Sequence, residues 1–232
     1  MSTTFTIKNC KVINEGQIEE KDLLIKNGRF EKIGNEINSE GHIIDASGLF
    51  LLPGVIDDQC HFREPGLTER GNIKTESLSA VAGGTTSFMD MPNVLPATLN
   101  HELWREKISI AEQNASANFS FYMGTSNTNI DEIKAINPRE VCGIKIFMGA
   151  STGNLLVDNE DTLNDLFKES PVIITTHCED TPMIKEMEEK YLAQYGTKIP
   201  IDLHAEIRSR EACFKSSKKA VDLAEKHDSC LL

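Results

Sequence analysis

After Leu49 the sequence alternates short apolar runs with longer amphipathic stretches, and this rhythm is the strongest constraint on its fold. Nearly continuous apolar runs are typical of parallel strands buried on both faces, and the amphipathic stretches are typical of crossover helices. The pattern predicts an α/β domain with strands at 51–57, 85–90, 118–123, 143–147 and 172–177. It also predicts helices at 72–82, 101–115, 131–136, 161–169, 183–193 and 206–226.

Strand–helix units that repeat every roughly 25 to 35 residues occur in doubly wound sheets and in TIM-type (β/α) barrels. Two features favour the barrel. No glycine-rich nucleotide loop follows the first strand, and polar residues recur at the C-terminal ends of the strands, where barrel enzymes keep their active sites. Residues 230–232 are interpreted as the start of a sixth strand, so we expect a partial barrel of strands one to five plus the start of six.

The first 50 residues follow a different pattern, with short strand-like segments, turns and no helical period. Segments 22–26 and 29–33 flank Asn27-Gly28. This dipeptide is typical of a tight hairpin, because both turn residues must take a positive φ. We therefore predict a small β-sandwich module at 1–50 and the partial barrel domain at 51–232.

The formal net charge of −12 argues against nucleic acid and anionic membranes as partners, because both would be repelled at long range. No targeting segment opens the chain and no run of about 18 apolar residues interrupts it, so we expect a cytoplasmic protein. The six cysteines lack any short repeated spacing. Most of them are interpreted as small buried hydrophobic residues, because a disulfide scaffold or zinc ribbon is spaced more regularly.

Polar groups gather where the first and fifth predicted strands end. Side chains alternate across a strand, so Asp57, Gln59 and His61 are expected to share the interior face of the barrel. His177 ends the fifth strand and is expected on the same rim. Each histidine fits two interpretations, a ligand of a divalent metal ion or a hydrogen-bonded core residue.

Lys145 lies within the apolar fourth strand, where an ammonium group is costly unless it is paired, deprotonated or chemically modified. The alternative is an ion pair with a carboxylate, or a side chain that extends to solvent. Two further residues could bind an anionic substrate, Arg63 through its guanidinium fork and Asn93 through its amide. Their alternatives are a surface ion pair for Arg63 with Glu64 or Glu69, and a turn after Pro92 for Asn93.

Taken together, these segments resemble the dihydroorotase family of the amidohydrolase superfamily, along nearly the whole chain. The resemblance rests on Pro-Gly-Val-Ile-Asp at 53–57, His-Phe-Arg-Glu-Pro-Gly at 61–66 and Ala-Gly-Gly-Thr-Thr at 82–86. It continues with Met-Pro-Asn at 91–93, Lys-Ile-Phe-Met-Gly at 145–149, His-Cys-Glu-Asp at 177–180 and Ile-Arg-Ser-Arg-Glu-Ala-Cys at 207–213. It implies a TIM-type barrel of the metal-dependent hydrolase kind.

The resemblance also implies roles for the candidate residues. His61, Lys145 and His177 match the metal shell, with Lys145 at the position that carries a bridging carbamate in some relatives, and Arg63 and Asn93 match the residues that hold the substrate carboxylate. The family motif His-x-His reads Gln-x-His here. An amide is a poorer zinc ligand than imidazole, so we expect one tightly bound zinc ion, with Gln59 and Asp57 in weak or outer positions.

The family also requires a histidine after strand six and a general acid/base aspartate after strand eight, and both are expected beyond Leu232. No catalytic acid or base is therefore assigned within the chain, and the 232 residues alone are expected to be inactive. The implied reaction is the reversible, zinc-dependent hydrolysis of dihydroorotate to N-carbamoyl-aspartate in pyrimidine synthesis, by a protein that is homo-oligomeric when full length. The alternatives are an allantoinase or hydantoinase, which use substrates without the carboxylate, and an inactive scaffold protein.

Overall fold

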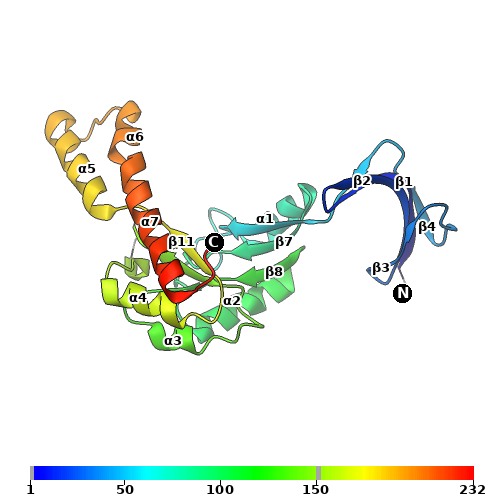
Figure 1. Cartoon of the computed structure of the whole chain (residues 1–232), viewed down its shortest axis with the longest axis horizontal. Helices are drawn as coiled ribbons and strands as arrows, with labels where there is room; N and C mark the ends of the chain where they lie inside the picture. The colour runs from blue at the N-terminus through cyan, green and yellow to red at the C-terminus, as the bar shows by residue number, and fades with distance from the viewer. Residues whose placement is uncertain (1–2, 150–152) are drawn as a thin grey trace. The chain divides into compact units, whose positions relative to one another are not determined.

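The structure is a computed structural model that describes residues 3–149 and 153–232. It divides into two compact units, Met1–Val55 and Ile56–Leu232, coloured from blue to cyan and from cyan to red in Figure 1. Across the described residues, no helix is both long and apolar enough to cross a membrane.

The first unit is a five-stranded sheet with the strand order β3-β2-β1-β4, in which β5 also pairs with β1. Asn27 and Gly28, with φ of 52° and 72°, connect β2 to β3 and confirm the predicted hairpin. Within the described residues the unit has this one sheet, where a two-sheet sandwich was expected. Its strands are β1 (Thr4–Asn14), β2 (Gln17–Lys26), β3 (Arg29–Gly34), β4 (His42–Asp45) and β5 (Phe50–Leu51).

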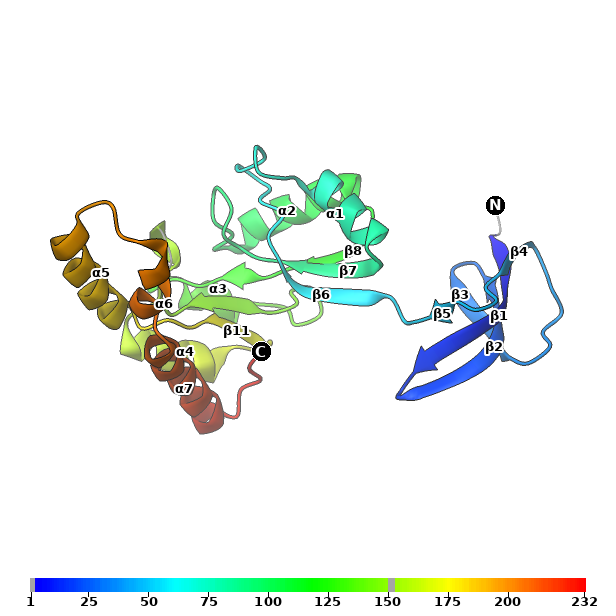
Figure 2. The same ribbon diagram turned by 90° about the horizontal axis from the view of Figure 1, so that it is seen from above.

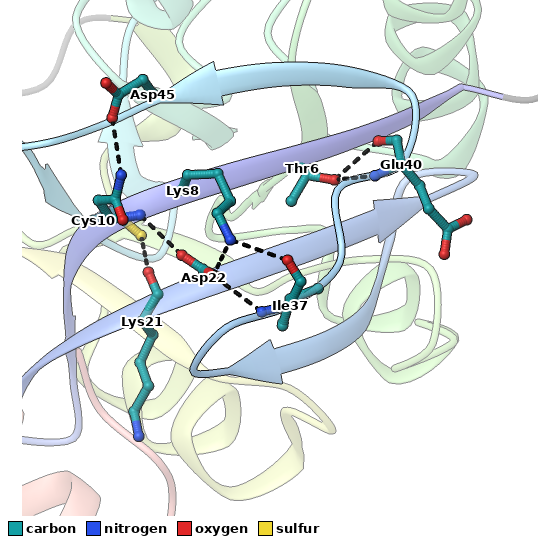
Figure 3. A network of polar contacts seen from close by, with 9 residues as sticks. Thr6, Lys8, Cys10, Lys21, Asp22, Ile37, Glu40 and Asp45 are labelled. Atoms are coloured by element: carbon teal, nitrogen blue, oxygen red, sulfur yellow. Dashed lines mark hydrogen bonds and ion pairs between the residues drawn. The ribbon is translucent and has the colours of Figure 1, made fainter.

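A buried carboxylate connects the strands of this sheet. Asp22 forms an ion pair with Lys8 and accepts a hydrogen bond from the backbone N–H of Ile37 at 3.1 Å, as Figure 3 shows. It also accepts a hydrogen bond from the backbone N–H of Asn9 at 3.0 Å. Lys8 also donates to the carbonyl of Ile37 at 3.0 Å. These contacts satisfy a carboxylate that is otherwise costly to bury.

The second unit contains two three-stranded sheets, β6-β7-β8 and β11-β10-β9. Only Tyr122 separates β8, in the first of these sheets, from β9, in the second. Figure 2 shows β6, β7 and β8 side by side. β7 pairs with β8, and β10 with both β9 and β11, in parallel. The strands are β6 (Val55–Cys60), β7 (Thr85–Asp90), β8 (Asn118–Phe121), β9 (Met123–Gly124), β10 (Ile144–Phe147) and β11 (Ile174–His177).

Helices α1 to α4 lie between these strands in sequence and α5 to α7 follow β11, which confirms the predicted α/β class. Apolar residues fill the core between strands and helices, among them Phe88, Phe121, Ile144 and Leu166. Leu231 forms an isolated parallel bridge to Ile174, in agreement with a strand starting at 230–232. The helices are α1 (Ile73–Ala82), α2 (His101–Asn114), α3 (Ile130–Lys134), α4 (Glu160–Glu169), α5 (Thr181–Tyr195), α6 (His204–Ile207) and α7 (Arg210–His227), with 3-10 turns at Gly153–Leu155 and Ile201–Leu203.

Three predicted elements are split in the structure, and the first is the strand expected at 118–123, which Tyr122 divides into β8 and β9. The strand expected at 51–57 is split, because Phe50–Leu51 pairs with β1, whereas β6 begins at Val55 and continues to Cys60, immediately before His61. The single helix expected at 206–226 is also split. Ser209 has an extended backbone and its hydroxyl caps a new helix by accepting a hydrogen bond from the Ala212 N–H at 3.2 Å.

Candidate active site

The five residues singled out for chemistry all lie in the second unit, in or just after four of its strands. His61 follows β6, Asn93 lies three residues after β7, Lys145 is the second residue of β10 and His177 is the last residue of β11. Arg63 lies two residues beyond His61. His61 and Asn93 thus follow neighbouring strands of one sheet, whereas Lys145 and His177 lie in paired parallel strands of the other.

His61 and Asn93 join the loops that follow β6 and β7. Nδ1 of His61 lies 2.8 Å from Oδ1 of Asn93. Burial lowers the pKa of His61, the contact with Asn93 raises it, and the charges of Arg63 and Lys145 lower it further. The imidazole therefore favours the neutral form.

Lys145 is buried, with only 2% of the residue exposed. Its Nζ lies 5.3 Å from the ring centroid of Phe147, and within the described residues it forms neither a salt bridge nor a hydrogen bond. The predicted alternatives of a carboxylate partner or a side chain reaching solvent are therefore wrong for the described residues. Burial lowers the pKa of Lys145 to about 8, because the charged amine loses its hydration without gaining a counter-ion.

His177 is oriented by an acidic neighbour. Its Nε2 lies 3.2 Å from Oε2 of Glu179, which also forms an ion pair with Arg208. Burial raises the pKa of Glu179, but the contacts with Arg208 and His177 outweigh burial and lower it overall. The centroid of the His177 ring lies 6.0 Å from that of Phe147, the same ring that contacts the Lys145 amine.

Arg63 and Asn93 line a pocket of about 840 Å³. Neither predicted ion pair of Arg63 is formed, because Glu64 accepts a hydrogen bond from the Ile73 N–H at 2.8 Å and Glu69 contacts Arg70. No aspartate or glutamate is among the described residues that line the pocket. A guanidinium and an amide in a pocket without carboxylates are suited to bind an anion. Besides Arg63 and Asn93, the lining includes Leu67, Arg70, Leu95, Leu99, Asn100, Leu103 and Asn154.

The remaining candidates, Asp57 and Gln59, contact each other. Oδ1 of Asp57 accepts a hydrogen bond from the backbone N–H of Gln59 at 3.1 Å, and Gln59 is exposed. Within residues 3–149 and 153–232, no three side chains of histidine, cysteine, aspartate or glutamate gather to hold a metal ion. A free Lys145 ammonium would repel a cation bound beside it, whereas a carbamate on the same side chain would be an anionic oxygen donor.

Sequence reasoning missed a second buried lysine beside the site. Lys107 of α2 and Asp90 of β7 form an ion pair of 2.7 Å, and both side chains are completely buried. The signal was present, because Lys107 lies three residues after Trp104 and four before Ala111, on the buried stripe of the helix. Glu179 and Arg208 were also missed, since their contact joins residues 29 positions apart.

Comparison with known proteins identifies relatives of one chemical kind. The chain is 32% identical over 216 residues to a dihydroorotase from Methanosarcina mazei, covering 91% of this chain and 46% of the relative. It is 29% identical over 230 residues to an allantoinase from Bacillus velezensis, covering 97% of this chain and 50% of the relative. No known protein-family model matches the chain.

The fold has a matching relative among solved structures. An L-hydantoinase from Arthrobacter aurescens superposes with a TM-score of 0.91 at 27% identity, covering 97% of this chain and 51% of the hydantoinase. The chain thus spans about half the length of the relatives it matches.

Proposed function

From its relationship to cyclic amidohydrolases, about half of whose length it matches, we propose that the protein hydrolyses a cyclic amide. The observation that carries the proposal is the buried Lys145 amine, which has no counter-ion among the described residues. A lysine in such surroundings is costly for folding, and costly buried charges concentrate at functional sites.

The proposed metal ligands are His61, His177 and a carbamate formed on Lys145. Carboxylation replaces a buried cation with an anion, which removes the repulsion between Lys145 and a bound cation. A divalent cation, which we propose to be zinc, would supply Lewis-acid activation of the water and of the amide carbonyl. The exposure of Gln59 and its weak ligand chemistry support one tightly bound ion and a second site that is at best partial.

Within this class we propose dihydroorotate as the substrate and N-carbamoyl-aspartate as the product. Arg63 and Asn93 would bind the ring carboxylate in their pocket and so orient the amide carbonyl toward His61 and Lys145. The contact between His61 and Asn93 supports separate roles in metal binding and substrate binding, because it holds the loops after β6 and β7 in one arrangement. Proton transfer to the leaving nitrogen is assigned to none of these residues.

The proposed setting of this reaction is a complete TIM-type barrel, of which β6 to β11 form the first part, in a homo-oligomeric cytoplasmic enzyme. The similarity in fold to the hydantoinase supports the barrel. The boundary proposed at residue 50 lies close to the one that separates the two compact units after Val55.

Two other functions fit part of the observations. An allantoinase or hydantoinase is favoured by relatives at nearly the same sequence identity as the dihydroorotases. An inactive scaffold is favoured by Gln59, which stands where the family has a histidine.

One experiment separates these functions. The complete natural protein is supplied with zinc and bicarbonate, and its hydrolysis of dihydroorotate, allantoin and hydantoin is measured at equal concentration. We expect turnover of dihydroorotate with kcat/KM at least about 100-fold above the other two, because only dihydroorotate carries the carboxylate. A preference for allantoin or hydantoin would show that dihydroorotate is not the substrate. If the zinc-loaded protein turned over none of the three compounds, the proposal that it is an enzyme of this class would be rejected.

A further inference from the structure

A completely buried ion pair lies directly behind the loops that carry the candidate site. Asp90 is the last residue of β7 and Lys107 lies in the middle of α2, and their side chains meet at 2.7 Å with no exposed surface on either. The Lys107 Nζ also lies 4.8 Å from the ring centroid of Phe121. A methionine could fill this space without the cost of desolvating two charges, so packing does not explain the pair.

The carboxylate holds the loop after β6. Oδ1 of Asp90 accepts a hydrogen bond from the backbone N–H of Phe62 at 2.8 Å, and the Cys60 thiol lies 3.8 Å from the same oxygen. Phe62 stands between His61 and Arg63. The bond therefore fixes the backbone from which the imidazole and the guanidinium both extend.

The ammonium holds the loop after β7. Lys107 Nζ donates a hydrogen bond to the Met91 carbonyl at 2.8 Å, two residues before Asn93. The two loops are also joined directly, because the Met91 N–H donates to the Cys60 carbonyl at 3.0 Å and the Leu95 N–H donates to the Pro65 carbonyl at 3.1 Å. One ion pair thus sits at the junction of both loops.

We propose that Asp90 and Lys107 are positioning residues, which hold His61, Arg63 and Asn93 in the one arrangement that the site uses. Their role in catalysis rests on the proposed function, but the geometry they impose does not. A buried pair suits this task, because each charge must keep its partners and so tolerates few alternative backbone positions.

The test replaces the pair by apolar groups in the double variant Asp90→Leu/Lys107→Met, because a single substitution would leave one buried charge unpaired. Lys8→Met/Asp22→Leu is the matched control. This control pair also joins a carboxylate that accepts backbone N–H bonds to a lysine that donates to a carbonyl, but it lies in the first unit.

Amide hydrogen exchange of the whole chain, followed by NMR, reports on the geometry. We expect exchange at Phe62, Met91 and Leu95 to become roughly tenfold faster in Asp90→Leu/Lys107→Met, while the amide of Ile174 in β11 changes little. The control variant should leave all four amides unchanged. Unchanged exchange at the three loop amides, or equal acceleration throughout the second unit, would overturn the proposal.

Two further measurements keep the test decisive. If the apolar double variant does not fold, Asp90→Asn/Lys107→Met keeps an acceptor for the Phe62 N–H and should still accelerate exchange at Met91 and Leu95. In the complete protein, kcat/KM for dihydroorotate should fall about 100-fold in either site variant and less than about threefold in the control. Absence of wild-type turnover would reject the proposed function, whereas the exchange pattern would still decide the positioning role.

Discussion

Nδ1 of His61 lies 2.8 Å from Oδ1 of Asn93, which joins the loops that follow the first two strands of the second unit. A carbonyl oxygen only accepts hydrogen bonds, so Nδ1 carries the proton in this contact. The lone pair of Nε2 is then free. The tautomer required of a metal ligand is thus selected by a residue that we propose to bind the substrate.

The guanidinium fork of Arg63 should decide substrate choice. In the complete protein, Arg63→Lys is expected to lower kcat/KM for dihydroorotate by roughly 30-fold, because an ammonium cannot bind a carboxylate through two parallel hydrogen bonds. Steady-state kinetics with dihydroorotate and hydantoin would measure this, and hydantoin turnover should change little.

Arg70 offers the comparison for this substitution. It lines the same pocket, but its side chain is 65% exposed and pairs with Glu69. Arg70→Lys is expected to change kcat/KM for dihydroorotate by less than about threefold. Equal losses in the two variants would show that general charge, and not the fork of Arg63, attracts the substrate.

Lys145 should reduce stability as long as it is not carboxylated. Burial lowers its pKa to about 8 from an ordinary 10.5. The unfolded chain therefore binds more protons between these values, so the wild type gains stability as pH rises through that window. We expect Lys145→Met to raise the free energy of unfolding by about 2 kcal/mol at pH 7 in bicarbonate-free, metal-free buffer.

Urea denaturation of the wild type and Lys145→Met at pH 7 and pH 10 would measure the size and sign of this difference in the free energy of unfolding. The stabilisation by Lys145→Met should be smaller at pH 10. Lys107→Met provides the contrast, because Lys107 is equally buried but paired with Asp90. Lys107→Met should lower the free energy of unfolding by roughly 3 to 5 kcal/mol, because it leaves the buried carboxylate of Asp90 unpaired. Destabilisation by both substitutions would contradict the description of Lys145 as an unpaired cation.

Glu179 should influence metal binding without being a ligand. It contacts Nε2 of His177 and is itself held by Arg208. Glu179→Gln is expected to weaken zinc binding by about 10- to 100-fold, because the ring loses the carboxylate that orients it. Chelator competition measures the affinity, with Glu160→Gln, an acid that pairs with Lys219, as the control. If Glu179→Gln bound zinc with wild-type affinity, Glu179 would have no role in the metal site.

Asp22 should make the first unit sensitive to acid. Burial raises its pKa, but the contacts with Lys8, Asn9 and Ile37 outweigh burial and lower it below the ordinary 3.8. Because the folded-state pKa is the lower one, the stabilisation is complete above about pH 4 and is lost as pH falls through the folded-state value.

Asp22→Asn is expected to reduce the stability of the first unit by about 2 kcal/mol at pH 7 and by less at pH 3. Amide exchange at Leu23 and Leu24, buried in the same strand, measures this directly. Glu40→Gln, which affects an exposed pair with Lys26, should cost less than about 0.5 kcal/mol.

Local patterns in the sequence predicted the elements well where one signal dominated. The strand at 85–90 and the hairpin at Asn27-Gly28 were predicted as they occur, because apolar runs and positive-φ turn residues act on the backbone directly. The prediction of one helix across 206–226 was wrong at Ser209, which is the N-cap of a new helix although the apolar periodicity continues through it. Periodicity reports which face of an element is buried, and it is less sensitive to where one helix ends and the next begins.

By itself the sequence determined the α/β class, the order of the elements and the strand ends at which His61, Asn93 and His177 lie. Those features depend on residues close together in the chain. Only the tertiary structure decided the partners: His61 with Asn93, Glu179 with Arg208, Asp90 with Lys107, and no counter-ion for Lys145 among the described residues. A charge far from its partner in sequence finds it only when packing brings two elements together, and the composition of either element does not reveal which two will meet.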